Sequence, residues 1–393
     1  MPDKLMQTTK VAGEGKTLHA KKFWPHELIL GLLPLFIGFE VMLWAVYLPL
    51  ATRGLADFRV FYADGYTLRT GQAAELNDIH PVFEKLLFVP LSLLAYRAAY
   101  WVFMAFNVAL LFLCGRLLRP RLKVLSDRWR WLPALLILAF IPISRALLIG
   151  QDSIILLTLL AAALWSLDHE KEFVAGLLVG LGIFKFQIVI PIALLFLIWK
   201  RWRFSAGFAV PSVAAGLVSL WLVGLGGARE YANLLLSISV RRPPQAEMLH
   251  YASNPRDMLN LRGLFFAILD GKLPHDYVQF LIAACSAVVL LAAARQRPSL
   301  PLAIVASSLV SYHMFSHDAS ILIIVIAAAL SSESLWKGAV AVLLLLAPLC
   351  ALILNRGYLV AIPLLGLFLL MLGRVPGRSE FTTGDRQNAI QRT

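Results

Sequence analysis

The sequence predicts an all-α, polytopic integral membrane protein, on the basis of composition and of the way apolar residues are grouped. Of the 393 residues, 59% are hydrophobic and 15% are charged, and the mean hydropathy is +0.75. Soluble domains carry about 25% charged residues, so this chain has too few to cover a surface that faces water. Continuous apolar blocks such as 28–50, 204–223 and 335–354 have the length of membrane-spanning helices. A barrel would instead show alternation, so the blocks favour helices.

We expect a single membrane domain over residues 28–372, because no polar segment is long enough to fold alone. A basic cytoplasmic tail, 1–27, precedes it, and a polar cytoplasmic tail, 373–393, follows it and is expected to be disordered. Block 28–50 is too long for a signal peptide and is interpreted as a retained first span. About 12 crossings are expected: 28–50, 98–114, 131–149, 153–167, 174–185, 187–199, 204–223, 277–294, 299–312, 319–330, 335–354 and 358–372. The shorter ones are candidates for broken or re-entrant helices.

The basic residues predict the orientation of the chain. They are dense in short loops such as 116–130, 200–203 and 295–297 and in both tails, which the positive-inside rule places in the cytoplasm. Segments 51–97 and 224–276 then lie outside. The net charge of +13 therefore reflects topology, and we exclude a nucleic-acid partner. We expect a multi-pass protein of the cell membrane, the inner membrane of a bacterium, with both termini in the cytoplasm.

This topology places the unusual polar residues near span ends on the extracytoplasmic side. They are Asp57, Arg59, Gln151, Asp152, Lys185, Gln187, Arg241, Arg242, Asn260, Arg262, His313, His317 and Asp318. Ionisable groups near the membrane core are costly and tend to be functional. Their shared side predicts one polar cavity that faces outward.

Asp57 follows the first span in the segment LADFRVFYADGY. A carboxylate in a cleft just outside the bilayer can act as a general base. The alternative is a solvated loop acid beside Arg59. Tyr62 and Tyr66 indicate an amphipathic helix on the membrane surface, or simply aromatic residues of the interface. Residues 80–96 continue this pattern and predict a second surface helix.

Two further segments interrupt apolar runs. Gly150, Gln151 and Asp152 predict a turn between spans, in which Asp152 caps the next helix. Lys185 lies within GLGIFKFQIVIP, where an unpaired ammonium costs about 3 kcal/mol. It should face a cavity or an anion such as a lipid phosphate, or else extend to the interface from a span end.

The later polar segments carry arginines and histidines. Arg241, Arg242 and Arg262 are suited to grip a phosphate, although each also fits an ordinary exposed loop. His313 and His317 are spaced to share one helical face beside Asp318, and they could bind metal, relay protons or contact a polar ligand. We favour the polar ligand, because zinc would need a third protein ligand.

The cysteines at 114, 285 and 350 lie in apolar runs without paired spacing, so no disulfide or metal framework is expected.

In this order, the motifs resemble a known family. A first span is followed by Asp-Phe-x-x-Phe-Tyr at Asp57, by Gly150-Gln151 and by a Gly-rich span that ends at Lys185. A basic Trp202-Arg203, then Asn260-Leu261-Arg262-Gly263 and a turn with His317-Asp318, complete the series. Over residues 28–330 the chain resembles glycosyltransferase family 87, the polyprenyl-phosphate-mannose-dependent mannosyltransferases of the GT-C superfamily.

The resemblance implies a GT-C-type helix bundle with amphipathic surface helices in the first external loop. It also implies inverting transfer of a sugar, mannose in this family, from a polyprenyl phosphate to an extracytoplasmic glycolipid, polysaccharide or protein. Asp57 would be the catalytic base, and no metal cofactor would be required. Lys185, Arg241, Arg242 and Arg262 would bind the donor phosphate or lipid. Substrate contacts would come from Arg59, Tyr62, Gln151, Asp152, Gln187, Asn260, His313, His317 and Asp318.

The chain departs from the family pattern at three points that bear on donor sugar and acceptor. His80-Pro81-Val82 replaces a typical Tyr-Pro-Pro, Asp152 follows Gly-Gln, and Phe186 rather than proline follows Lys185. Two other functions are compatible with many spans: a transporter or lipid flippase, and a non-catalytic envelope partner. A transporter or flippase often contains an inverted repeat, and the sequence shows none. A non-catalytic envelope partner would not need the clustered polar residues.

Overall fold

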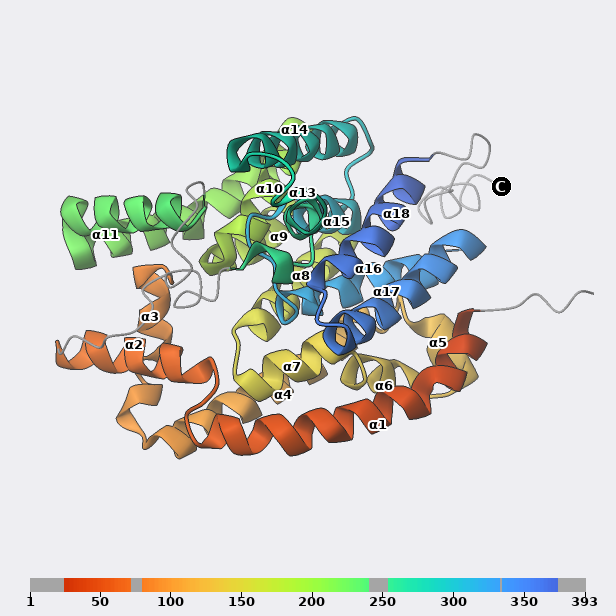
Figure 1. Ribbon diagram of the computed structural model, residues 1–393, viewed down its shortest axis with the longest axis horizontal. Helices are drawn as coiled ribbons and strands as arrows, with labels where there is room; N and C mark the ends of the chain where they lie inside the picture. Colours follow the sequence, from red (N-terminus) through yellow and green to blue (C-terminus); the bar gives the residue numbers. More distant parts are fainter. Residues whose placement is uncertain (1–24, 72–79, 240–253, 333, 374–393) are drawn as a thin grey trace, which may run out of the picture.

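The structure is a computed structural model that describes residues 25–71, 80–239, 254–332 and 334–373 (Figure 1). Its regular elements are helices: α1 (Pro25–Thr52), α2 (Phe58–Thr70), α3 (Val82–Phe88), η1 (Leu91–Leu93), α4 (Tyr96–Leu118), α5 (Lys123–Arg128), α6 (Leu132–Leu138), α7 (Ile141–Ile149), α8 (Ser153–Asp168), α9 (Glu172–Leu181), η2 (Ile183–Lys185), α10 (Phe186–Ile198), α11 (Trp202–Ser239), η3 (Pro255–Asp257), α13 (Leu261–Leu269), α14 (His275–Ala294), α15 (Leu300–Val310), η4 (Asp318–Ile321), α16 (Leu322–Leu330), α17 (Leu335–Ile353), η5 (Gly357–Val360) and α18 (Ala361–Leu372). The predicted all-α membrane fold is confirmed. The two predicted tails lie almost entirely outside the described residues.

Five of these helices are long and apolar enough to cross a membrane: α1, α4, α11, α14 and α17. Two bent pairs each form a further candidate span, α6 with α7 at 55° and α9 with η2 and α10 at 67°. The predicted crossings 174–185 and 187–199 are therefore the two arms of one bent pair. The expectation that broken helices occur among the short segments is confirmed. Four other predicted crossings are shorter apolar helices of 10–17 residues: 153–168, 300–310, 318–330 and 357–372.

Glycines set the close packing of α9 against α11. Gly176 and Gly180 lie one turn apart on α9, and a Cβ at Gly176 would overlap the backbone of Phe204 on α11. Small residues spaced by four are how membrane helices bring their backbones together. Beyond this contact α11 extends away from the bundle (Figure 1) and is kinked at Gly224, which has φ 65°. None of its apolar window is buried, so we assign this surface to lipid.

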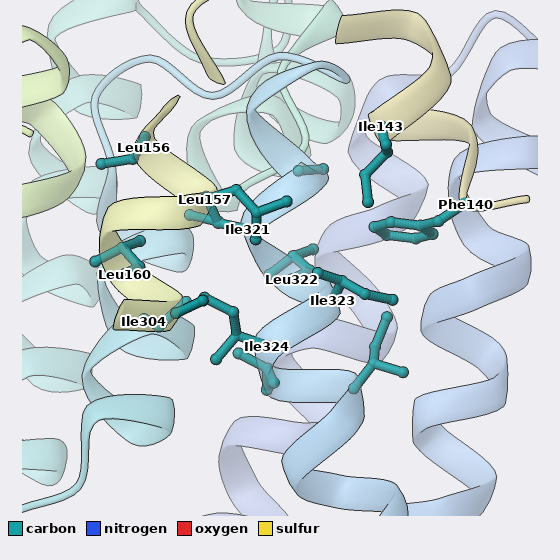
Figure 2. Close-up of a cluster of buried hydrophobic side chains, with 14 of the residues drawn as sticks. Phe140, Ile143, Leu156, Leu157, Leu160, Ile304, Ile321, Leu322, Ile323 and Ile324 are labelled. Atoms are coloured by element: carbon teal, nitrogen blue, oxygen red, sulfur yellow. The ribbon is translucent and has the colours of Figure 1, made fainter. Parts of the chain in front are cut away.

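The tightest part of the core lies between α7, α8, α15, η4 and α16. Figure 2 shows side chains from this region, among them Leu157, Ile304 and Ile323, which have no exposed surface. In a membrane protein such side chains stabilise the bundle through close van der Waals packing, because lipid tails are as apolar as they are. The core therefore fixes the end of α7 and the starts of α8 and η4. Those three helix ends carry the polar residues of the candidate site.

The segment between α1 and α4 contains α2 and α3, in the region where the sequence predicts two surface helices. Phe61 of α2 stacks on Phe88, the last residue of α3, with ring centroids 4.6 Å apart, and on His80 at 4.5 Å. Asp64 of α2 contacts His80 at 3.4 Å and Lys85 at 3.7 Å. Stacked rings and ion pairs thus join the two helices on either side of the undescribed residues 72–79.

Candidate active site

Asp57 lies in the turn between α1 and α2, at the position that precedes the first residue of α2. Its side chain makes no capping hydrogen bond to that helix. Instead, its Oδ2 accepts a hydrogen bond of 2.7 Å from Nε2 of Gln151. Two residues 94 positions apart are thereby joined at one point. The sequence placed both in one polar cavity, and the structure brings them into direct contact.

Gly150 explains why Gln151 reaches Asp57. It ends α7 with φ +70°, a left-handed conformation that glycine adopts without strain. A Cβ at this position would lie 2.6 Å from the Cβ of Phe58, the residue after Asp57. Phe58 is fully buried and stacks on Phe103 at 5.3 Å. The absent side chain of Gly150 therefore allows the Asp57-Phe58 turn to pack against the Gly150-Gln151 turn.

A cavity of about 390 Å³ opens beside Asp57, and we call it the Asp57 cavity. Its walls are largely apolar and come from the ends of α1, α7 and α17 and from the segments around Leu259 and Phe315. Five charged or titratable side chains line it: Tyr47, Asp57, Arg145, Asp257 and His317. The cavity thus combines an apolar lining with a small polar centre, which is typical of a ligand-binding site.

Arg145 is a member of this site that the sequence interpretation missed. It lies in the middle of α7, within the apolar segment IPISRALLI, and is only partly exposed. Its Nε is buried and has no hydrogen-bond partner among the described residues. A buried guanidinium nitrogen without a partner is costly, so a bound ligand that accepts from it would be favoured. The signal was present, because a cation inside an apolar run is the same observation that selected Lys185.

Lys185 lies next to this cavity but is not among the residues that line it. Its Nζ is 2.9 Å from Oδ1 of Asp152 and 3.2 Å from Oδ1 of Asp318. All three side chains are buried. Asp318 also accepts hydrogen bonds from Ser153 Oγ and from the backbone N–H of Phe315, each 3.0 Å long. Of the environments predicted for Lys185, the ammonium thus has an anion, but the anions are two protein carboxylates in place of a lipid phosphate.

The same ion pairs change the assignment of Asp152. It occupies the residue before α8, as predicted, but its side chain makes no capping hydrogen bond, so the predicted cap is wrong. The reason is that Lys185 attracts the carboxylate toward η2. Asp152 directly follows Gln151, which contacts Asp57, and Asp318 directly follows His317, which lines the Asp57 cavity. Lys185 thus links the two turns that carry these side chains.

Glu84 of α3 belongs to the same buried group, and the sequence analysis also missed it. Its side chain is 1% exposed. Burial, together with the neighbouring carboxylate of Asp152, raises the pKa of Glu84 well above its usual range. These surroundings favour the protonated form of the carboxyl. Through Glu84, the segment between α1 and α4 is coupled to Asp152 and Lys185.

The segment with the two histidines is not helical, which corrects the prediction that a helix places both rings on one face. Residues 311–317 form an irregular connection between α15 and η4. His317 lines the Asp57 cavity, while His313 packs on Phe315 with ring centroids 4.7 Å apart. Burial, opposed by the Asp318 carboxylate, lowers the pKa of His317, and burial near Arg262 lowers that of His313 to about 3. Both rings are thus neutral at pH 7.

Asn260 and Arg262 support this segment and do not line the cavity. The side chain of Asn260 accepts from the N–H of Gly263 at 3.2 Å, which caps α13, and donates to the carbonyl of Ser311. Arg262 lies over the ring of Tyr312, 4.0 Å from its centroid. Their direct contacts with substrate remain predictions.

The remaining predicted site residues lie elsewhere. Arg59 and Tyr62 line a separate groove on the other side of the Asp57 turn. Gln187 lies in the first turn of α10 and is not among the residues of the Asp57 cavity. Arg241 and Arg242 lie outside the described residues.

Comparison with known proteins identifies the family. The sequence profile of glycosyltransferase family 87 matches residues 79–317, more than half of the chain. The matched region contains Arg145, Gln151, Lys185 and His317, while Asp57 precedes it. A stretch of 164 residues is 30% identical to an alpha-(1->3)-arabinofuranosyltransferase of Corynebacterium glutamicum. The alignment covers 38% of this chain and 39% of that protein, and no solved structure matches. With its candidate membrane-spanning helices and its cavity, the chain belongs to glycosyltransferase family 87.

Proposed function

We propose that the protein transfers a sugar from a polyprenyl-phosphate donor to an extracytoplasmic acceptor, with Asp57 as general base. The observation that carries the proposal is that a carboxylate, a guanidinium and an imidazole, from Asp57, Arg145 and His317, line one cavity. The carboxylate suits proton abstraction, and the guanidinium suits a phosphate. Transport or flipping of a lipid would not require the carboxylate to be positioned by Gln151.

In the proposed step, the acceptor hydroxyl oxygen attacks the anomeric carbon from the face opposite the phosphate. The new carbon–oxygen bond forms as the bond to the phosphate oxygen breaks, and the configuration inverts. The acceptor proton moves to Asp57, and the electron pair leaves with the polyprenyl phosphate. Since Gln151 donates to Oδ2, Oδ1 is available to accept the proton. The leaving group is an ionised phosphate, so the step needs no metal.

Arg145, rather than Lys185, is the proposed phosphate ligand. Lys185 is held by two carboxylates at 2.9 and 3.2 Å, while the Nε of Arg145 has no partner among the described residues. Neutral His317 would add a hydrogen bond. These groups would act on charge that develops on the leaving oxygen, which is where electrostatic stabilisation is most effective.

The donor sugar has two candidates. Mannose follows from the resemblance of the motifs described above. Arabinofuranose is favoured by the relative from Corynebacterium glutamicum, whose name specifies that transfer. Both donors carry the same phosphate and the same type of leaving group, so the proposed roles of Asp57 and Arg145 apply to either.

The test is transfer by the purified protein in lipid nanodiscs. Polyprenyl-phosphate mannose and polyprenyl-phosphate arabinofuranose, each labelled in the sugar, are incubated with a cell-envelope extract as acceptor. We expect one donor to give a labelled product together with free polyprenyl phosphate. Asp57→Asn should lower the rate by about 10²–10⁴, the range that general-base catalysis contributes.

Asp257→Asn is the matched control, because Asp257 is the other carboxylate that lines the Asp57 cavity. It should retain most of the activity. The base assignment fails if Asp57→Asn is fully active or if only Asp257→Asn is inactive. The proposed function fails if neither donor is consumed while intact donor crosses the membrane of proteoliposomes.

A further inference from the structure

A second cavity of about 700 Å³ lies on the other side of the Asp57 turn, and we call it the arginine groove. It is formed by the end of α1, the following turn, one face of α2 and the start of α4. Three arginines and three tyrosines contribute to its lining: Arg53, Arg59, Arg97, Tyr62, Tyr66 and Tyr96. None of these six side chains lines the Asp57 cavity.

The aromatic walls of the groove are held in place by the backbone around them. Tyr62 Oη donates to the carbonyl of Leu94 at 2.8 Å, and Tyr96 Oη donates to the carbonyl of Ala51 at 2.9 Å. The two rings meet edge to face, with centroids 5.4 Å apart. Rings that are fixed before a ligand arrives lose little entropy on binding, and their faces suit the C–H face of a sugar.

The three arginines of the groove have no counter-charge in the described part of the chain. No carboxylate there lies within ion-pairing distance of Arg53, Arg59 or Arg97. Arg97 Nε donates to the carbonyl of Thr52 at 3.4 Å. Some exposed arginines elsewhere have a carboxylate partner, as Arg201 has in Glu172 at 2.8 Å, and others such as Arg116 have none among the described residues; the three groove arginines differ in lining one concave surface together. Three unpaired guanidinium groups in one concave site favour an anion.

The groove and the Asp57 cavity meet at Leu55, which lines both. Asp57 follows two residues later in the same turn. A ligand whose charged end lies among the arginines therefore has a short path to the carboxylate. Arg145, the proposed phosphate ligand, lines the Asp57 cavity and does not line the groove. With the donor phosphate assigned to the Asp57 cavity, the arginine groove is available to the acceptor.

We propose that the arginine groove binds the anionic group of the acceptor, a phosphate or a carboxylate attached to a sugar or to a lipid headgroup. Binding of the anion does not depend on the proposed function. The statement that this anion belongs to the acceptor rests on the proposed function.

The test measures binding of three probes to the full-length protein in detergent micelles by titration calorimetry. Dihexanoyl phosphatidylglycerol supplies an anionic headgroup, dihexanoyl phosphatidylcholine supplies a zwitterionic one, and glucose 6-phosphate supplies a soluble sugar phosphate. At least one anionic probe should bind ten times more tightly than phosphatidylcholine. Binding of phosphatidylglycerol alone assigns the site to a lipid headgroup, and binding of glucose 6-phosphate assigns it to a soluble or glycan-borne anion.

The variant R53Q/R59Q/R97Q should weaken binding of the anionic probe at least tenfold. Arg116→Gln is the matched control, because it removes the same charge from an exposed position at the opposite end of α4, and it should bind as the wild type does. If the triple variant has a lower melting temperature, the single variants Arg53→Gln and Arg59→Gln replace it. Unchanged binding in these variants, or no preference for an anion in the wild type, overturns the proposal.

Asp57→Asn separates this inference from the proposed function. It should bind the anionic probe with wild-type affinity while transfer is lost. Wild-type transfer by that variant would overturn the base assignment and leave the groove standing. A wild-type protein that catalyses transfer but shows no preference for an anionic probe would overturn the groove and leave the proposed function standing.

Discussion

Lys185 and Arg145 are both cations within apolar segments, yet their surroundings are opposite. Lys185 is buried between two carboxylates, with two ion pairs of 2.9 and 3.2 Å. Arg145 borders a cavity, and its Nε has no partner among the described residues. A buried charge that is fully paired contributes to structure, and one that faces a cavity without a partner is available to a ligand. The residue type alone does not separate these two roles.

The largest expected effect is loss of stability when Lys185 is replaced. Lys185→Met leaves Asp152 and Asp318 buried without their cation, and breaking a buried pair in this way costs about 3–5 kcal/mol. We expect a large fall in the melting temperature in nanodiscs. The triple variant K185M/D152N/D318N should recover much of it. Lys272→Met, an exposed lysine, is the control and should melt as the wild type does.

Arg145→Gln should lower activity and leave stability unchanged, in contrast to Lys185→Met. Removing one group that stabilises transition-state charge costs about 10²–10³ in kcat. Its melting temperature should stay close to that of the wild type, because no ion pair is broken. Arg145→Lys should recover part of the activity, since it retains the charge without the fork of donors. Comparable losses of stability in Arg145→Gln and Lys185→Met would remove the contrast between the two sites.

Gly150→Ala tests whether the turn that carries Gln151 is as constrained as the geometry implies. The substitution forces a left-handed conformation on alanine and brings a Cβ to 2.6 Å from that of Phe58. Such strain costs about 1–3 kcal/mol, and it should also lower transfer by moving Gln151 away from Asp57. Gly38→Ala on α1 has no atoms within 4 Å of the added Cβ and is the control. Equal melting temperatures for the two variants would contradict this account.

Glu84→Gln gives the smallest effect, which is visible only as a pH dependence. Because the pKa of Glu84 is raised in the folded protein, folding takes up a proton. Stability from this group is complete below the pKa of the unfolded chain, about 4.3, and is lost as the pH rises through the folded pKa. Glutamine resembles the protonated acid and should remove this loss. The melting temperature of the variant relative to wild type should therefore rise between pH 5 and 8; a constant difference argues against a protonated Glu84.

The sequence predicted the fold class, the surface helices and the shared location of Asp57, Gln151 and His317. Composition and apolar blocks determine a membrane fold, and order of motifs determines the family. The role of Lys185 was not predictable, because its partners, Asp152 and Asp318, are 33 and 133 residues away along the chain. The loop with His313 and His317 was predicted as helix from spacing, but Asn260 and Asp318 bind its backbone groups and stabilise an irregular path.

Arg145 was missed for a different reason. It lies inside a segment that counts as a span by hydropathy, where a single arginine lowers the average only slightly. Glu84 was missed because a short helix outside the membrane gives no indication that one of its acids is buried. Both residues illustrate that burial of a charge in a bundle is decided by contacts between distant segments.

The three-way contact among Asp152, Lys185 and Asp318 has a consequence for how such sequences diverge. Loss of the lysine would leave two buried carboxylates without a cation, whereas loss of either aspartate would still leave one ammonium paired with one carboxylate, so replacement of the lysine is the change that requires compensation. Homologues that lack the lysine are thus expected to have neutral residues at one or both acidic positions. Such paired changes would mark proteins that share this internal arrangement, even where the rest of their sequences has diverged.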